Sequence, residues 1–373
     1  MTIDYLALAQ PGVQGLKPYE PGKPIETLER ELGIRDSIKL ASNENPLGPS
    51  PRALEALRAG LDKIALYPDG AGHALKSAIA ERIGCDPACV TLGSGSSEIL
   101  DLTARAYLGP GLEAVYSEHA FAVYPLVAQA AGAECKVAPA NAADDVQPYG
   151  HHPDKLLARM SARTRVVFIA NPNNPTGTWL NEAALRALIA SIPETAVVVV
   201  DEAYCEFVEA PDYPDTTRWL EDFPNLIVTR TFSKIHGLAG LRIGYGVSGP
   251  EIADVLNRVR QPFNTGSLAQ IAALAALRDG THIRLSRENN TLGLAQLAAG
   301  FKAQGLPYLP SVGNFICVDV GRTAAAVYRR MLELGVIVRP IANYGFPNCL
   351  RISVGTPAQN DRALAALQQA LLA

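Results

Sequence analysis

Paired cysteines are missing from this sequence. Its six cysteines are scattered through 373 residues without CxxC spacing: Cys85, Cys89, Cys135, Cys205, Cys317 and Cys349. This excludes a small disulfide-stapled fold and a cysteine-rich zinc site, and we interpret the thiols as free and buried. The adjacent His151 and His152 lie in a loop with no matching ligand partners, so we predict no metal site.

Long apolar runs and an excess of basic residues are also missing. The chain opens without a basic segment, and no uncharged apolar run reaches membrane-spanning length. The formal net charge of −4 offers no electrostatic attraction for a phosphate backbone. We therefore expect a cytoplasmic protein that binds neither membrane nor nucleic acid and acts on small molecules.

The sequence also lacks the glycine-rich loops that are typical of nucleotide-binding proteins. No G-x-x-x-x-G-K-[ST] segment is present, which excludes a P-loop. The loop Gly93-Ser94-Gly95 follows a strand-like run but has no third glycine, which argues against a dinucleotide fingerprint and a hydride-transferring enzyme.

What the sequence does have is length enough for two domains. A chain of 373 residues exceeds the size at which a single core keeps growing. We expect an N-terminal arm and the start of a small domain at 1–45, a large domain at 46–265 and a smaller C-terminal α+β domain at 266–373. Pro11, Pro18, Pro21 and Pro24 predict an extended arm before a helix at 26–32.

Apolar runs alternate with helical patterns through the middle of the chain. The runs lie at 165–170, 196–200 and 226–229, and helical periodicity covers 180–192 and 251–259. Continuous β-branched runs suit strands covered on both faces, so we predict an α/β fold with a mostly parallel central sheet between helices. Helices at 267–277 and about 281–304 then precede shorter strands near 315–320 and 350–354.

A single lysine stands out in the segment 231–245. Lys234 lies among small polar residues, with Arg242 eight positions later. Lysine amines form Schiff bases with carbonyl cofactors, and pyridoxal phosphate (PLP) needs such a lysine together with cationic and hydroxyl groups for its phosphate. Lys234 would hold the aldehyde, and Thr231, Ser233 and Arg242 would surround the phosphate. An exposed lysine in a glycine-rich loop is the alternative.

Polar residues at two further strand ends match the same chemistry. Asp201 ends the most apolar run, where a carboxylate is costly to bury without a cation such as a pyridinium N–H. A helix cap or a metal-binding aspartate is the alternative. Tyr204, three residues on, and Asn174, at the preceding strand end, are candidates to reach the cofactor's phenolic oxygen. A purely structural turn explains the rest of 171–177 as well.

Two more segments supply candidate cofactor contacts. Residues 91–100 read as a strand end, a glycine loop and a helix start, so Ser96 and Ser97 would meet an anion through free backbone N–H groups. Alternatively, Ser97 caps the helix. Phe121 is a candidate to stack on the pyridine ring, although aromatic residues at this spacing are more often in the core.

Two arginines interrupt apolar strand-like runs near the C-terminus. Arg339 and Arg351 each need an anionic partner at such a position. Planar bidentate pairing makes arginine suitable for a substrate carboxylate or phosphate. An internal salt bridge to Asp or Glu is the alternative.

Together, Asn174, Asp201, Tyr204, Lys234 and Arg242 resemble the fold type I PLP aminotransferases in order and spacing. More narrowly, the segments at 17–24, 40–48, 66–69 and 350–356 are similar to the histidinol-phosphate aminotransferase group of the class II subgroup. The resemblance implies the cofactor pyridoxal 5'-phosphate, with 46–265 as its binding domain. It also implies transamination of L-histidinol phosphate with 2-oxoglutarate, in histidine biosynthesis.

The resemblance also implies residue roles. Lys234 would be the Schiff-base lysine and would move a proton between the substrate Cα and the cofactor. Tyr67 would reach across a homodimer interface to the partner's cofactor phosphate. Tyr19, Arg339 and Arg351 would bind the substrate's phosphate, and Arg351 would also bind the α-carboxylate of glutamate or 2-oxoglutarate. Many relatives have Asp where this chain has Ser97, which matters little if contact is through backbone N–H.

Three alternative functions remain at this point. An aromatic-amino-acid aminotransferase, or an enzyme of dual specificity, resembles this pattern strongly. A threonine-phosphate decarboxylase shares the fold and the arginines, but the segment 17–24 favours histidinol phosphate. A non-catalytic PLP-binding regulator would carry a DNA-binding module, and the proline-rich arm before residue 40 is too short for one.

Overall fold

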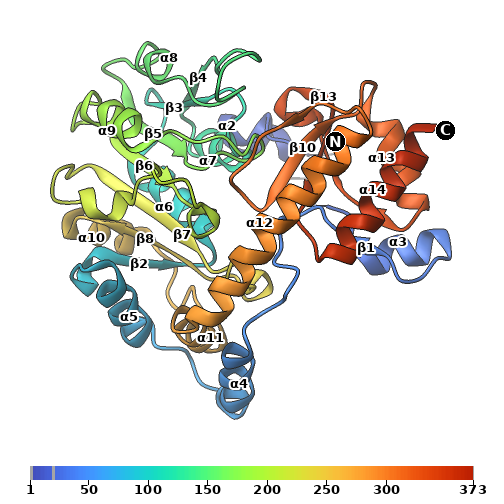
Figure 1. Ribbon diagram of the computed structural model, residues 1–373. Helices are drawn as coiled ribbons and strands as arrows, with labels where there is room; N and C mark the ends of the chain where they lie inside the picture. Colours follow the sequence, from blue (N-terminus) through green and yellow to red (C-terminus); the bar gives the residue numbers. More distant parts are fainter. Residues whose placement is uncertain (1–2, 19–21, 373) are drawn as a thin grey trace.

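A seven-stranded sheet forms the centre of the larger part of the molecule. The computed structural model describes residues 3–18 and 22–372 (Figure 1). The strand order is β2-β8-β7-β6-β5-β3-β4. The bounds are β2 (Val90–Gly93), β3 (Glu113–Ser117), β4 (Glu134–Ala138), β5 (Thr164–Ala170), β6 (Val197–Asp201), β7 (Leu226–Thr231) and β8 (Gly244–Ser248). Only β8 runs antiparallel to its neighbours, so the expected mostly parallel sheet is confirmed.

Helices cover both faces of this sheet, which explains its β-branched runs. Val197 and Val199 pack on the face covered by α6 (Ser96–Tyr107), α7 (Val123–Ala130) and α10 (Pro250–Val259). Val198 and Val200 pack on the other face with α8 (Pro153–Leu157) and α9 (Glu182–Ala190). Side chains alternate between faces along a strand, so both faces of β6 are apolar.

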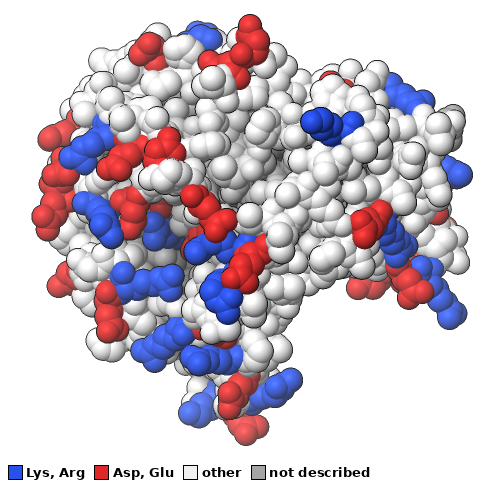
Figure 2. All heavy atoms as spheres, in the orientation of Figure 1, with Lys and Arg blue, Asp and Glu red and all other residues white. Residues whose placement is uncertain are grey.

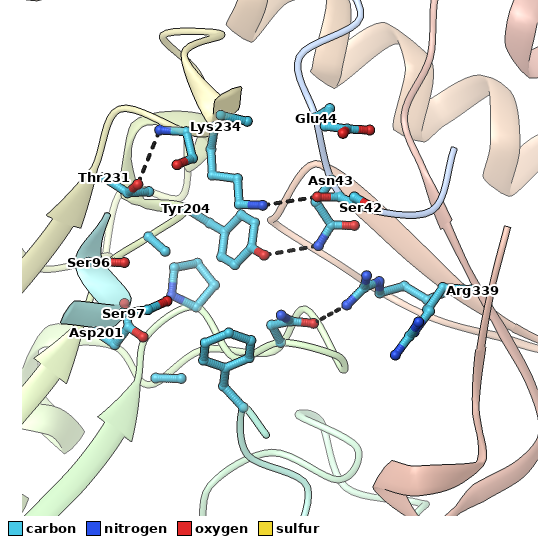
Figure 3. A pocket seen from close by; sticks show the side chains of 18 of the residues that line it. Ser42, Asn43, Glu44, Ser96, Ser97, Asp201, Tyr204, Thr231, Lys234 and Arg339 are labelled. Carbon is cyan, nitrogen blue, oxygen red and sulfur yellow. Dashed lines mark hydrogen bonds between the residues drawn. The ribbon is translucent and has the colours of Figure 1, made fainter. Parts of the chain in front are cut away.

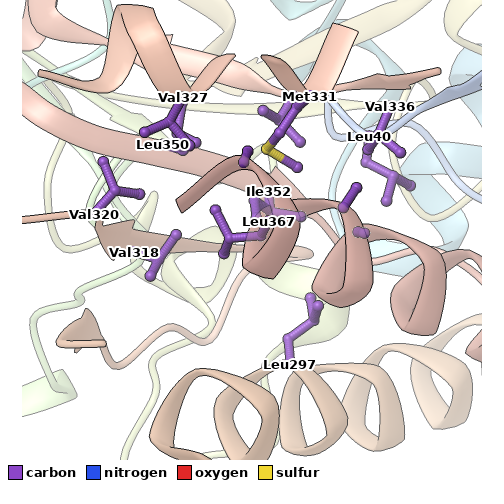
Figure 4. Packing of buried hydrophobic residues seen from close by; sticks show 14 of the residues in the cluster. Leu40, Leu297, Val318, Val320, Val327, Met331, Val336, Leu350, Ile352 and Leu367 are labelled. Atoms are coloured by element: carbon purple, nitrogen blue, oxygen red, sulfur yellow. The ribbon is translucent and has the colours of Figure 1, made fainter. Parts of the chain in front are cut away.

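A smaller α+β unit packs beside the large sheet. Its antiparallel sheet has the order β12-β13-β10-β9, and β1 pairs in parallel with β11. The strands are β1 (Ile38–Lys39), β9 (Tyr308–Leu309), β10 (Phe315–Asp319), β11 (Val336–Ile337), β12 (Arg339–Ile341) and β13 (Phe346–Ser353). Helices α12 (Gly280–Ala303), α13 (Ala324–Glu333) and α14 (Pro357–Leu372) enclose a core that includes Leu40, Met331 and Leu367 (Figure 4).

Helix α11 (Ser267–Leu277) belongs by its packing to the large sheet rather than to the smaller unit. Its alanine face joins one core with Leu75 and Leu92, beside α4 (Pro51–Gly60) and α5 (His73–Ile83). The chain passes to the smaller unit along α12, whose residue Leu297 lies in the small core. By core packing, α11 joins the large sheet and α12 reaches the smaller unit, while the boundary at residue 266 stays a prediction.

The N-terminal arm is more ordered than its prolines suggest. Two short helices, α1 (Tyr5–Leu8) and α2 (Pro11–Gln14), occupy the region predicted to be extended. The Asp4 carboxylate caps the first, and Pro11 occupies the first turn of the second, where its missing N–H costs nothing. The predicted helix at 26–32 is present as α3 (Ile25–Leu32).

Six short 3-10 turns complete the description. They are η1 (Leu61–Lys63), η2 (Pro87–Cys89), η3 (Cys205–Phe207), η4 (Thr216–Trp219), η5 (Ala239–Leu241) and η6 (Ala342–Tyr344).

Figure 2 shows cationic and anionic side chains interspersed over the visible face. Within residues 3–18 and 22–372, no helix combines the length and apolar character needed to cross a bilayer.

Candidate active site

A cavity of about 250 Å³ lies where the carboxyl ends of β5, β6 and β7 meet the smaller unit (Figure 3). In sheets of this kind, ligands bind at this edge. Twelve of the residues singled out from the sequence line it: Ser96, Ser97, Phe121, Asn174, Asp201, Tyr204, Thr231, Ser233, Lys234, Arg242, Arg339 and Arg351. The fold therefore brings together side chains that are far apart in the sequence.

Lys234 extends into the cavity from the loop after β7. Its Nζ donates a hydrogen bond to the carbonyl of Ser42 at 3.0 Å (Figure 3). Burial, with help from the nearby charge of Arg351, lowers the pKa of Lys234 to about 7. The loop turns back through Gly237, at φ 69°, where a Cβ would lie 2.2 Å from the carbonyl oxygen of Gly48. The result is a buried amine of which a substantial fraction is neutral near physiological pH.

We expect covalent trapping of Lys234 by a small aldehyde and cyanoborohydride to speed up as pH rises through 7. Only the neutral amine is nucleophilic, and with a pKa of about 7 its neutral fraction grows about tenfold between pH 6 and 8. Peptide mapping of the cofactor-free protein would follow the modified lysine, with Lys234→Ala as the background. A midpoint near the ordinary lysine value would contradict this assignment.

Asp201 is the last residue of β6 and is buried. Its carboxylate accepts hydrogen bonds from the Thr229 hydroxyl at 3.0 Å and the Tyr124 hydroxyl at 3.1 Å. Burial raises the pKa of Asp201 despite these two donors. A carboxylate held between neutral donors at a cavity wall is suited to pair with a cationic N–H from a ligand.

Tyr204 and Asn174 follow β6 and β5 of the large sheet, and each forms a hydrogen bond across the cavity toward the smaller unit. The Tyr204 oxygen accepts a hydrogen bond from Asn43 Nδ2 at 2.9 Å, and burial raises the pKa of the phenol to about 12. Lys234 Nζ lies 5.6 Å from the centroid of the Tyr204 ring. Asn174 Oδ1 accepts a hydrogen bond from Arg351 Nη1, which links the large sheet to β13. Both candidates thus adjoin the lysine or the arginine.

A cradle suited to an anion lies at the start of α6. Ser96 and Ser97 are its first two residues, and the N-cap residue is Gly95 rather than Ser97. A Cβ on Gly95 would lie 2.4 Å from Arg242 Nη2, so glycine leaves room for the guanidinium. Arg242 in turn donates to the Ser233 hydroxyl at 3.3 Å. A helix N-terminus, hydroxyls and a guanidinium therefore converge.

Arg339 and Arg351 form a second cationic group on another wall. They are directly opposite each other in the β12–β13 pairing, and both line the cavity. Like charges at such a position are unfavourable unless an anion is shared between them. Within the described residues, the hydrogen-bond acceptors of Arg351 are neutral, namely Asn174 Oδ1 and the Ala41 carbonyl, and its buried Nε has none. This favours a ligand anion over an internal salt bridge for Arg351.

Among the candidates within the described residues, Tyr67 does not line this cavity. Tyr67 is 83% exposed and stacks on Phe263 with ring centroids 4.7 Å apart. Tyr19 lies outside the described residues.

Several residues around the cavity were given no role from the sequence. Tyr124 and Thr229 hold Asp201, and the segment 41–44 forms one wall. The segment 40–48 is one of the segments similar to the histidinol-phosphate aminotransferase group, so the sequence did indicate that it has a functional role. Nothing local in the sequence indicates that its backbone and amide meet Lys234 and Tyr204.

Comparisons with known proteins point in one direction. The family described as aminotransferase class I and II matches residues 35–367. Histidinol-phosphate aminotransferase 2 of Pseudomonas fluorescens Pf0-1 is 57% identical over 373 residues, covering 100% of this chain and 99% of the relative. Its namesake in Pseudomonas aeruginosa PAO1 is 56% identical over 370 residues, covering 99% of each chain.

Solved structures agree with these relatives. Histidinol-phosphate aminotransferase from Sinorhizobium meliloti, in complex with pyridoxal-5'-phosphate, superposes with a TM-score of 0.88 at 31% identity over 98% of this chain and 97% of that one. A Thermus thermophilus aspartate aminotransferase double mutant gives a TM-score of 0.83 at 24% identity over 97% and 99%, a likeness of fold alone.

Proposed function

Because this chain belongs to the class I and II aminotransferase family, we propose that it transfers the amino group of L-histidinol phosphate to 2-oxoglutarate, in histidine biosynthesis. The products are imidazole-acetol phosphate and glutamate. One observation carries the proposal: a single cavity holds a buried lysine with a lowered pKa, a buried aspartate and two separate cationic walls. One wall suits the phosphate of a cofactor, and the other suits the phosphate or carboxylate of a substrate.

The residues fit pyridoxal 5'-phosphate, the cofactor of this family. Its phosphate would bind at the cradle of Ser96, Ser97, Thr231, Ser233 and Arg242. The buried Asp201 would hold the ring nitrogen, Phe121 would stack on the ring, and Asn174 and Tyr204 would reach the phenolic oxygen. When bound, the cofactor supplies an aldehyde and an electron sink for bond cleavage at the substrate Cα.

The protein's own groups would perform the proton chemistry. Lys234 Nζ is buried and its pKa is lowered to about 7, so its neutral form would take the proton from the substrate Cα as a general base. Asp201, kept ionised by a cationic partner, would hold a proton on the ring nitrogen of the cofactor. Arg351, already oriented by Asn174 and Ala41, would hold the carboxylate of glutamate, and with Arg339 and Tyr19 the phosphate of histidinol phosphate.

Single-turnover absorbance of the cofactor-loaded protein tests this function. L-Histidinol phosphate and L-phenylalanine would be mixed separately with the protein, following loss of the visible cofactor band. Fast loss with the phosphate ester alone supports the proposal, because only that substrate offers the second cationic wall a dianion. Fast loss with both would establish dual specificity, and fast loss with phenylalanine alone would replace the proposal with an aromatic aminotransferase.

We further propose that the active form is a homodimer with shared active sites. Leu61, Ile64, Leu66 and Tyr67 are all more than half exposed in one stretch of chain after α4. Such an apolar stretch is typical of an interface. Tyr67 is exposed and does not line its own cavity, and it would serve the cofactor phosphate of the partner.

Mixing two inactive variants tests the shared site. Lys234→Ala and Tyr67→Ala protomers, unfolded together and refolded, would form hybrid dimers in which one site has both the lysine and the tyrosine intact. We expect recovery of roughly a quarter of wild-type activity, since about half of the dimers are hybrids with one working site each. Each variant refolded alone is the control. No recovery beyond those controls would contradict the proposal.

A further inference from the structure

The segment 41–45 crosses the cavity between the two units and touches three of the groups discussed above. The Ala41 carbonyl accepts from Arg351 at 2.8 Å, the Ser42 carbonyl accepts from Lys234 at 3.0 Å, and Asn43 donates to Tyr204 at 2.9 Å (Figure 3). The first two contacts use backbone atoms and tolerate many side chains. Only the third depends on the identity of the residue.

Asn43 is held as tightly as any polar residue of the site. It is 1% exposed and has a φ of 54°, a conformation that asparagine and glycine adopt more readily than other residues. Its backbone N–H donates to the Ser353 hydroxyl at 2.8 Å, and Asn314 Nδ2 donates to its carbonyl at 3.0 Å. These bonds tie it to the smaller unit.

The same contacts fix which end of the Asn43 amide faces Tyr204. The Ser353 hydroxyl accepts from the Asn43 N–H, so its own hydrogen is available for Asn43 Oδ1, 3.0 Å away. With Oδ1 engaged, Nδ2 faces the Tyr204 oxygen as a donor. A phenol oxygen that accepts there must direct its own hydrogen elsewhere, and the cavity lies alongside.

Resting on the function proposed above, we propose that Asn43 is a positioning residue for Tyr204. Its amide points the phenol hydrogen into the cavity, toward the phenolic oxygen of the cofactor, and strengthens that donor. A stronger donor at this oxygen stabilises the deprotonated form of the lysine–cofactor link. Asn43 thereby lowers the pH at which the bound cofactor gains its proton.

The other charged and titratable groups around Tyr204 do not change when Asn43 is replaced. Arg351 from β13 lowers the pKa of the phenol, whereas Asp201 from β6 and Tyr344 from η6 raise it. Lys234 lies over the ring. None of these four is hydrogen-bonded to the Asn43 amide, so replacing Asn43 leaves their charges in place.

A double-mutant cycle tests the proposal on the cofactor-loaded protein. Asn43→Gly, which keeps the backbone conformation accessible, would be made in the wild type and in Tyr204→Phe. The measurement is the pH midpoint of the visible absorbance of the bound cofactor. We expect Asn43→Gly to raise the midpoint by about half to one unit in the wild type, the range for one neutral hydrogen bond, and to leave it in place in Tyr204→Phe.

The outcomes separate this inference from the proposed function. Equal shifts in both backgrounds would overturn the role of Asn43 alone. No shift for Tyr204→Phe itself would overturn the assignment of Tyr204 to the cofactor. If Asn43→Gly does not fold, Asn43→Asp replaces it: a carboxylate accepts rather than donates, so it would draw the phenol hydrogen away from the cavity and should raise the midpoint further with Tyr204 present than in Tyr204→Phe. Asn314→Ala is the control for loosening: it should lower the unfolding temperature without moving the midpoint.

Discussion

Lys234→Ala should lower the rate of transamination by about 10⁴-fold or more, the upper end of what one acid–base group contributes. The variant loses both the amine that holds the cofactor and the base that removes the substrate proton. It should still bind pyridoxal phosphate, because the phosphate cradle around Arg242 and the carboxylate of Asp201 are untouched. Steady-state kinetics with L-histidinol phosphate and cofactor binding by equilibrium dialysis measure the two effects.

Borohydride reduction separates this prediction from a general loss of structure. Reduction should fix the cofactor to Lys234 in the wild type and leave the variant without a modified lysine. Lys76→Ala is the matched control: burial also lowers the pKa of Lys76, but this residue lies in α5, away from the cavity. A reducible lysine adduct that persists in Lys234→Ala would refute the assignment.

Asp201→Asn should lower transamination by about 10²- to 10⁴-fold, the range for removing one partner of a buried charge pair. The asparagine keeps the shape of the side chain but cannot hold a proton on the cofactor's ring nitrogen. Asp201→Glu retains the charge and should recover part of the loss. Kinetics of the three proteins at equal cofactor saturation make the comparison.

Asp201→Asn should stabilise the cofactor-free protein, although it lowers the activity of the cofactor-loaded enzyme. Burial raises the pKa of Asp201 above its unfolded value, so between those two values the folded state binds more protons, and stability falls as pH rises. Above both values the buried carboxylate is a cost that asparagine removes. Asp201→Asn should therefore unfold at a higher temperature than the wild type at neutral pH when both lack cofactor. A lower unfolding temperature would show that the hydroxyls of Thr229 and Tyr124 already satisfy the carboxylate.

The sequence predicted individual strands and helices well where their own residues decide the structure, but not which elements pack together. The apolar run that ends at Asp201 predicted a strand with helices on both faces. Its valines alternate between the two faces, and each face packs against a different set of helices. The helix at 267–277 is present with the expected bounds, yet its neighbours were not predictable, since alanines pack equally well against either unit. Asp4 and Pro11 start short helices in a region whose prolines indicated an extended chain.

The residues of the candidate site also divide into those that the local sequence identified and those that only the fold reveals. Lys234 and Asp201 are recognisable because each lies at or just after the end of an apolar strand, where a charge needs a partner, and Arg242 because it lies eight positions after Lys234. Asn43 gives no such signal, because its meaning comes from Tyr204 and Ser353, which lie 161 and 310 residues away. The direct opposition of Arg339 and Arg351 likewise needs the β12–β13 register. Contacts that depend on register and fold closure have no trace in the local sequence.

The pairing of β1 with β11 also sets an order of events during synthesis. Ile38 and Leu40 belong to the smaller unit, but Val336, Leu350 and Ser353 are made last. At about 5–20 residues per second, the ribosome would take roughly 15 to 60 s to deliver Ser353 after Asn43. The large sheet has all its strands before then. The strands of the large sheet are thus available before the residues that complete the wall beside Tyr204 and Lys234, so we expect that wall to close last.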